Sequence, residues 1–101
     1  MAFNTRELNN NKISDFGNGS WHDLASLREL VLFQNQMTIV KNFMFAELGG
    51  LEKLNINYNR IQQIKDDAFY GLQNLTELYI SGNGLQFIGY TSFMELKSLE
   101  I

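Results

Sequence analysis

The residues able to take part in acid–base or metal chemistry are few and scattered. The chain has a single histidine, His22, with Asp23 beside it, and its closest carboxylate pair is Asp66-Asp67. A catalytic histidine needs a nucleophile and an orienting group in a defined arrangement, and no motif supplies a serine or cysteine partner. Two adjacent aspartates are too few oxygen ligands for a cation. No glycine-rich phosphate loop occurs. We therefore expect a protein that is not an enzyme, with no cofactor and no metal.

Composition narrows the function classes further. The 101 residues carry a formal net charge of −3, so the chain has no basic field to attract nucleic acid. The longest apolar run, Phe43 to Ala46, is far shorter than the ~20 residues needed to span a bilayer. The first residues show no signal peptide, and the compartment stays open. Cysteine is absent, which excludes disulfides and thiol chemistry within these residues.

The element that must position any functional residue is an internal repeat of 24 residues. The segment Leu51 to Asn59 returns one period later as Leu75 to Asn83 and one period earlier as Leu27 to Asn35. Such self-similarity indicates a repeat architecture in which each unit stacks on the next. We divide the single domain, 1–101, into copies. These are a degraded capping copy at 1–26, full copies at 27–50, 51–74 and 75–98, and the start of another at 99–101.

Each copy changes its periodicity part way along. From Glu29 to Phe33 polar and apolar residues alternate strictly, which predicts a strand. The apolar positions then spread out, which predicts a loose return path with a turn of helix or 3₁₀ structure. A crossover of this length makes successive strands parallel. Arg6 occupies a position where later copies have leucine, consistent with a terminal copy that has one side in water.

Two further sets of equivalent residues, one of asparagines and one of aromatic residues, recur at the same period, and we call each set a column. We expect the asparagines to pair the backbone of the bend after each strand, because an amide side chain both donates and accepts hydrogen bonds. We expect the aromatic residues to fill the return side of the core. The asparagine column is Asn11, Asn35, Asn59 and Asn83, and the aromatic column is Trp21, Phe45, Phe69 and Phe93.

The frame Leu-x-x-Leu-x-Leu-x-x-Asn-x-Leu/Ile, followed by Phe-x-x-Leu, resembles a leucine-rich repeat. It is most similar to the 24-residue type of extracellular receptor, matrix and adhesion proteins, although the frequent proline and the cysteine-rich caps of that group are missing. The resemblance implies an α/β-type repeat solenoid. Its shape would be a horseshoe, with a parallel concave sheet and a mostly irregular or 3₁₀ convex side. It also implies protein binding on the concave face.

By alternation, the strand residues that do not enter the core line this concave face. Most are polar, but Val31, Phe33, Tyr58 and Tyr79 are not, and apolar anchors of this kind are typical of protein interfaces. Scattered apolar residues are also normal on surfaces. Phe33 is the most informative, because it has no polar atom that favours exposure. The predicted partner-binding residues are Glu29, Val31, Phe33, Lys53, Asn55, Asn57, Tyr58, Glu77 and Tyr79.

Two acceptor triplets for N-glycosylation occur, at Asn18 (Asn-Gly-Ser) and Asn74 (Asn-Leu-Thr). They matter only if the protein passes through a secretory compartment, and a sugar at either site would mark a surface not used for contact.

Two functions follow from the sequence. The first is a protein-binding module that uses the concave face. The second is a truncated or engineered repeat scaffold without a ligand of its own, which forms a homodimer through an uncapped C-terminal end. That end would bury Leu75, Leu78, Ile80, Leu99 and Ile101.

Overall fold

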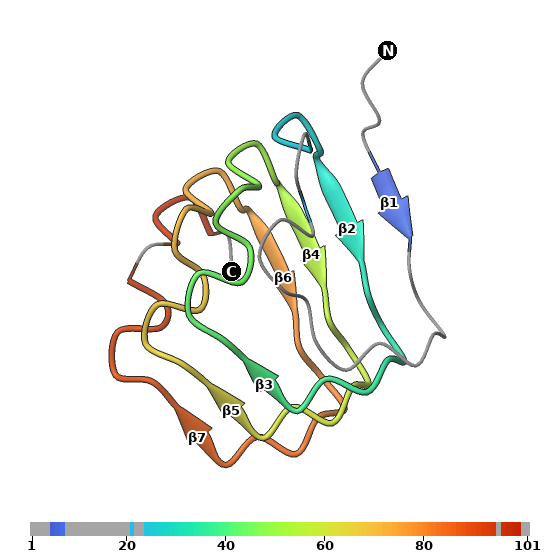
Figure 1. Ribbon diagram of the computed structural model, residues 1–101, viewed down its shortest axis with the longest axis vertical. Helices are drawn as coiled ribbons and strands as arrows, with labels where there is room; N and C mark the ends of the chain where they lie inside the picture. Colours follow the sequence, from blue (N-terminus) through green and yellow to red (C-terminus); the bar gives the residue numbers. More distant parts are fainter. Residues whose placement is uncertain (1–4, 8–20, 22–23, 95, 100–101) are drawn as a thin grey trace.

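Two parallel sheets run along the molecule and face each other across its core (Figure 1). The computed structural model describes residues 5–7, 21, 24–94 and 96–99. The larger sheet has the order β1-β2-β4-β6 and the smaller one the order β3-β5-β7. The four strands of the larger sheet are β1 (Thr5–Glu7), β2 (Glu29–Val31), β4 (Lys53–Asn55) and β6 (Glu77–Tyr79). The smaller sheet consists of β3 (Ile39–Val40), β5 (Gln63–Ile64) and β7 (Phe87–Ile88).

The register of both sheets reproduces the sequence period. Leu30 of β2 pairs with Leu54 of β4, which in turn pairs with Leu78 of β6. In the smaller sheet Val40 pairs with Ile64. Equivalent residues of successive copies are therefore neighbours, and every strand lies beside the strand of the next copy. The predicted parallel repeat fold is confirmed for the described residues.

The core is formed by the inward side chains of both sheets and of the turns between them. In the third copy the eight predicted core positions are all fully or almost fully buried, from Leu51 to Leu72. Burial of a large apolar side chain stabilises a protein by about 1.5–3 kcal/mol. One copy has only one layer of such side chains, so its core is complete only where the next copy covers it.

The asparagine column pairs the backbone of consecutive copies, as predicted. The side-chain amide of Asn59 donates to the carbonyls of Ile56 and Leu32, both at 3.0 Å. Its Oδ1 accepts from the N–H of Met37 at 3.3 Å. Asn83 makes the equivalent bonds one period later, and Asn35 donates to the carbonyl of Leu32 at 3.0 Å. Asn11 lies outside the described residues.

Three residues of the aromatic column, Trp21, Phe45 and Phe69, fill the core as predicted, whereas Phe93 is 39% exposed. Trp21 stacks on Phe45 with ring centroids 6.2 Å apart, and Phe69 stacks on Phe93 at 5.7 Å. The indole N–H of Trp21 donates to the carbonyl of Met44 at 2.9 Å, which satisfies its only polar atom.

The return path agrees with the sequence prediction in its turns and adds a sheet that was not predicted. The described residues contain no helix there, but the expected 3₁₀-type turns occur, with the N–H of Met44 bonded to the carbonyl of Lys41 at 3.3 Å and that of Ala68 to Lys65 at 3.2 Å. What the sequence did not predict is that each return segment also contributes a two-residue strand to the smaller sheet. Stacking explains the difference: once the copies are in register, short extended segments at equivalent positions lie side by side and pair. The isolated segments contain too few alternating residues to predict this.

The last copy that the structure describes has core positions that are less well covered than those of the copy before it. Leu78 and Ile80 are only partly buried, whereas Leu54 and Ile56, one period earlier, are completely buried. Ile88 is 50% exposed, although Ile64 at the equivalent position is buried. Leu75 is buried and Leu99 is partly buried, while Ile101 lies outside the described residues.

Candidate functional site

The candidate site is the outer face of the four-stranded sheet, which we call the sheet face. Because Leu30, Leu54 and Leu78 point into the core, their strand neighbours point outward. The register then aligns these neighbours in rows across the strands. The sheet face consists of Glu29, Val31, Lys53, Asn55, Glu77 and Tyr79, with Phe33, Asn57 and Tyr58 at the ends of the strands.

One row of the sheet face is charged and alternates in sign. Glu29 pairs in register with Lys53, and Lys53 with Glu77. The Lys53 Nζ lies 3.4 Å from Oε2 of Glu77, with both side chains partly exposed. Solvent and salt screen an exposed ion pair of this kind, so the pair adds little to the stability of the fold. Its charges remain accessible to a partner.

Tyr79 and Glu77 interact on the same strand. The Tyr79 hydroxyl donates a hydrogen bond to the Glu77 carboxylate. This bond lowers the pKa of Glu77, and Lys53 acts in the same direction. The same bond raises the pKa of Tyr79. The carboxylate therefore stays ionised and the phenol stays protonated over the whole neutral range.

The two asparagines of the sheet face, Asn55 and Asn57, also accept hydrogen bonds from the backbone. The N–H of Asn57 donates to Oδ1 of Asn55 at 3.0 Å, and Oδ1 of Asn57 accepts from the N–H of Ser81 at 2.6 Å. The first bond shapes the chain just after β4, and the second ties it to the chain that follows β6. The sequence assigned both asparagines to binding, and the structure adds this second role.

The apolar members of the sheet face are not equally accessible. Tyr58 is 59% exposed, Tyr79 is 43% exposed and Phe33 is partly buried. Val31 is buried, so the expectation that it forms part of an exposed surface is wrong. Its strand, β2, has β1 on one side and β4 on the other, and a short branched side chain in an interior strand has chain on both sides of it.

The turn that follows β4 sets the position of Tyr58. Gln34, Tyr58 and Gly82 are equivalent residues just before the column asparagines, and all three have positive φ, at 59°, 56° and 69°. The Tyr58 ring lies against Gly82, where a Cβ atom would overlap it. The structure places Tyr58 beyond the end of β4, as expected from the sequence, but sequence reasoning missed this contact, because it depends on both the turn conformation and the stacking.

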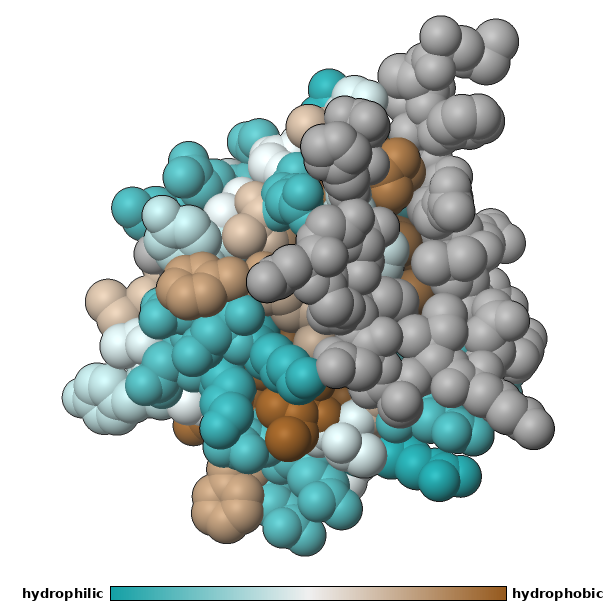
Figure 2. Space-filling view, viewed as in Figure 1, coloured by the Kyte–Doolittle hydropathy of each residue, from teal (hydrophilic) through white to brown (hydrophobic). Residues whose placement is uncertain are grey.

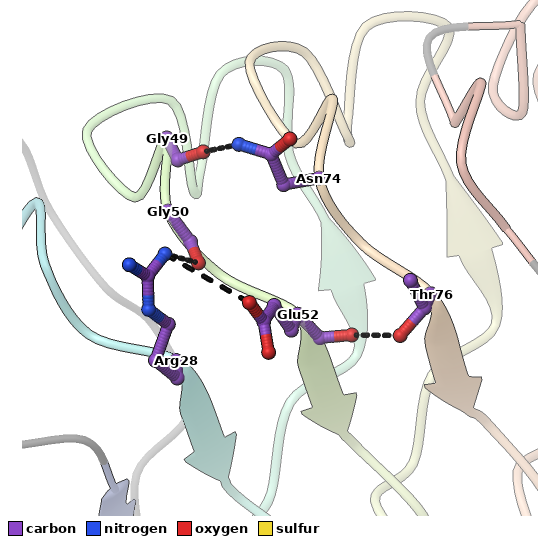
Figure 3. A network of polar contacts seen from close by, with 6 residues as sticks. All are labelled: Arg28, Gly49, Gly50, Glu52, Asn74 and Thr76. Atoms are coloured by element: carbon purple, nitrogen blue, oxygen red, sulfur yellow. Dashed lines mark hydrogen bonds and ion pairs between the residues drawn. The ribbon is translucent and has the colours of Figure 1, made fainter.

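The acceptor triplet at Asn74 lies in a polar network outside the sheet face (Figure 3). The Asn74 side chain donates to the carbonyl of Gly49 at 2.9 Å, and the Thr76 hydroxyl donates to the carbonyl of Glu52 at 3.1 Å. Arg28 donates to the carbonyl of Gly50 at 3.0 Å and lies 3.9 Å from Glu52. Both polar residues of the triplet thus help to join consecutive copies. Asn18 lies outside the described residues.

A second set of exposed aromatic residues was missed from the sequence. Phe87 is 66% exposed and Tyr90 is 97% exposed, where the preceding copy has the polar residues Gln63 and Asp66. A comparison of equivalent positions was the signal that could have found them. Phe87 borders an open depression of about 270 Å³ between β5 and β7. Figure 2 shows hydrophobic side chains separated by hydrophilic ones on the face in view, rather than one continuous patch.

Other kinds of site find no support among the described residues. No group of three or more metal-ligating side chains occurs there. In the same part of the chain, no helix has the length and apolar character required to cross a membrane. His22 and Asp23 lie outside the described residues.

The parallel strands, their 24-residue register and the asparagine column define a protein built from stacked strand-and-turn repeats. The model of the leucine rich repeat family matches residues 49–101, more than half of the chain. The chain therefore belongs to the leucine-rich repeat family, whose domains are generally non-enzymatic protein-interaction modules. A search of curated proteins finds no match to this chain.

Proposed function

We propose that this protein binds another protein through its sheet face, on a short leucine-rich repeat solenoid whose four-stranded sheet forms the concave side of a horseshoe. The observation that carries the proposal is that alternation along paired strands directs Phe33 and Tyr79 to the same side as a row of accessible charges, with the exposed Tyr58 just beyond β4. Exposed aromatic side chains supply contact area at little entropic cost, and the charges fix orientation. Extracellular and adhesion roles rest on the resemblance of the repeat type alone.

The membership of individual residues in this binding face follows from their exposure. Tyr58, Tyr79 and Lys53 present the most accessible side chains and are proposed as its centre. Glu29, Phe33, Asn55, Asn57 and Glu77 surround them. Val31 contributes by supporting the sheet rather than by contact.

The experiment starts from peptides selected for binding to the immobilised protein from a displayed random library. Each selected peptide is then titrated against the parent protein, Phe33→Ser, Tyr58→Ser and the control variant Tyr90→Ser. Tyr90 is the matched control because it is a fully exposed aromatic residue outside the sheet face. We expect the sheet-face variants to weaken binding at least about tenfold, or 1.4 kcal/mol. Peptides whose affinity falls for Tyr90→Ser but is unchanged for both sheet-face variants would contradict the proposal.

A second candidate function is self-association through the fourth copy. The specific observation in its favour is the incomplete burial of Leu78, Ile80 and Ile88 at positions that are buried in the preceding copy. Light scattering across a range of protein concentrations tests it: we expect the mass of a dimer. A monomer at every concentration would remove this candidate and leave the first untouched.

A further inference from the structure

One asparagine of the column is followed by a glycine, and the two residues can react with each other. The residues that follow the three described column asparagines are Gln36, Arg60 and Gly84. In an Asn-Gly pair the backbone nitrogen of the glycine can attack the side-chain amide carbon of the asparagine and close a five-membered succinimide ring. Glycine favours this attack because it has no Cβ atom beside the nitrogen. The fourth copy therefore carries a reactive pair that the second and third copies lack.

The nucleophile of this reaction, the backbone nitrogen of Gly84, is accessible. At the equivalent position of the third copy, Arg60 donates its N–H to the carbonyl of Met37 at 2.9 Å. Among the residues that the structure describes, no group accepts a hydrogen bond from the N–H of Gly84. Gly84 and Arg60 are both exposed, so this position faces solvent in both copies. Neither a hydrogen bond nor a covering side chain therefore hinders attack by this nitrogen.

The electrophile, the side-chain amide of Asn83, is held by four hydrogen bonds. Its Nδ2 donates to the carbonyls of Ile56, Ile80 and Ser81, at 3.2, 3.1 and 3.2 Å. Its Oδ1 accepts from the N–H of Ile61 at 3.0 Å. All four partners precede Asn83 in the chain, whereas ring closure requires the amide carbon to approach the nitrogen of the residue that follows. The side chain has to leave these partners before it can react.

From this arrangement we infer that Asn83 is a site of spontaneous deamidation, which the folded stack protects and which local opening of the turn exposes. The rate of modification follows the fraction of molecules in which the turn is open, because only a released amide reaches the nitrogen of Gly84. This site is independent of the proposed protein-binding function.

The reaction consumes one water molecule and releases one ammonia molecule. Hydroxide removes the proton from the N–H of Gly84, and the nitrogen forms a bond to Cγ of Asn83. The bond between Cγ and Nδ2 then breaks, and Nδ2 takes up a proton and leaves as ammonia. Water opens the succinimide at either of its two carbonyls, which gives an aspartate or an isoaspartate at position 83. No oxidant or reductant takes part.

Neither product can rebuild the hydrogen bonds of the turn. A carboxylate accepts hydrogen bonds but donates none, so the carbonyls of Ile56 and Ile80 lose a donor and face a negative charge. Isoaspartate also inserts a methylene carbon into the main chain. The carbonyl of Ser81, which Asn83 holds, accepts in addition from the N–H of Tyr58 at 2.9 Å. Modification therefore makes an opening of this turn permanent and loosens the chain beside Tyr58.

Peptide mapping by mass spectrometry after incubation at mildly alkaline pH tests the inference, because it follows each asparagine separately. We expect Asn83 to deamidate at least about tenfold more slowly in the folded protein than in urea above the unfolding transition, a ratio equivalent to about 1.4 kcal/mol of protection. In urea Asn83 should match Asn18, which also precedes a glycine, and should react faster than Asn59. Equal rates for Asn83 with and without urea would overturn the protection. A rate in urea no higher than that of Asn59 would overturn the site.

Two glycine variants separate the chemistry from the opening. Gly84→Ala should slow the reaction in urea to the level of Asn59 and leave the fold intact, because an added Cβ atom meets nothing within 4 Å. Gly82→Ala strains the same turn at φ 69°, and it should speed the reaction in the folded protein without changing the rate in urea. A Gly82→Ala protein that deamidates at the parent's rate would show that opening of the turn does not control the reaction.

The consequence for stability is read from the modified protein itself. Protein that has deamidated at Asn83 is separated from the unmodified chain by ion exchange, since it carries an additional negative charge. We expect it to unfold at a lower urea concentration than the unmodified chain. Equal midpoints would overturn the inference that modification makes the opening permanent.

Discussion

The side-chain amide of Asn59 donates to the carbonyl of Leu32, 27 residues earlier and in the preceding copy, at 3.0 Å. The same amide nitrogen donates to Ile56 within its own copy, and Oδ1 accepts from Met37. One side chain therefore satisfies backbone groups on two turns at once. The sheet face exists in its present form because bonds of this kind hold successive strands in register.

Asn59→Ala should destabilise the protein by about 1–3 kcal/mol, because it leaves buried backbone groups without partners. Asn59→Asp should also destabilise it: aspartate can still accept from Met37 but has lost the donor. Urea unfolding followed by circular dichroism measures both. Asn74→Ala, which removes one exposed bond to Gly49, is the control and should cost less. Equal midpoints for Asn59→Ala and the parent would contradict the structural role.

The loss of stability on truncating a core leucine should be smaller in the fourth copy than in the third. Leu54→Ala removes a completely buried side chain and should cost about 2–5 kcal/mol. Leu78→Ala, the equivalent change one copy later, should cost less in a monomer because Leu78 is only partly buried. Chemical denaturation at low protein concentration compares the two. Equal losses would indicate that the fourth copy is covered as well as the third.

Gly82→Ala should destabilise the fold in two separable ways. A side chain at φ 69° is strained, at a cost of about 1–2 kcal/mol, and the new methyl group also overlaps the Tyr58 ring. Tyr58→Ala removes the overlap but leaves the strain. The double variant should therefore lose less stability than the sum of the two single variants in thermal or urea unfolding. Simple additivity would show that the ring moves aside freely.

The bond between Tyr79 and Glu77 should be visible in titrations. Because the folded protein holds the pKa of Glu77 below 4.5, the contribution of this carboxylate to stability is present above that value and is lost as the pH falls through the folded pKa. The pKa of Tyr79 is raised above 10.0, so its contribution is present below that value and is lost as the pH rises through the folded pKa. Tyr79→Phe should raise the pKa of Glu77, as followed by carboxyl carbon NMR shifts. An unchanged Glu77 titration would contradict the bond.

The sequence by itself determined the repeat. A period of 24 residues and strict alternation around Leu30, Leu54 and Leu78 are enough to predict parallel strands in register, because each copy can bury its apolar side only against an equivalent one. The asparagine and aromatic columns followed for the same reason. Most of the sheet face was predictable as well, since alternation divides inward from outward residues wherever a strand is correctly placed.

The tertiary structure alone decided the rest. The smaller sheet forms because stacking brings two-residue segments together, and such segments carry too little pattern to be recognised singly. Alternation gives the direction of a side chain but not its exposure, so Val31 points outward and is nevertheless buried. The Tyr58 contact with Gly82 likewise depends on how one copy lies on the next, which no single copy encodes.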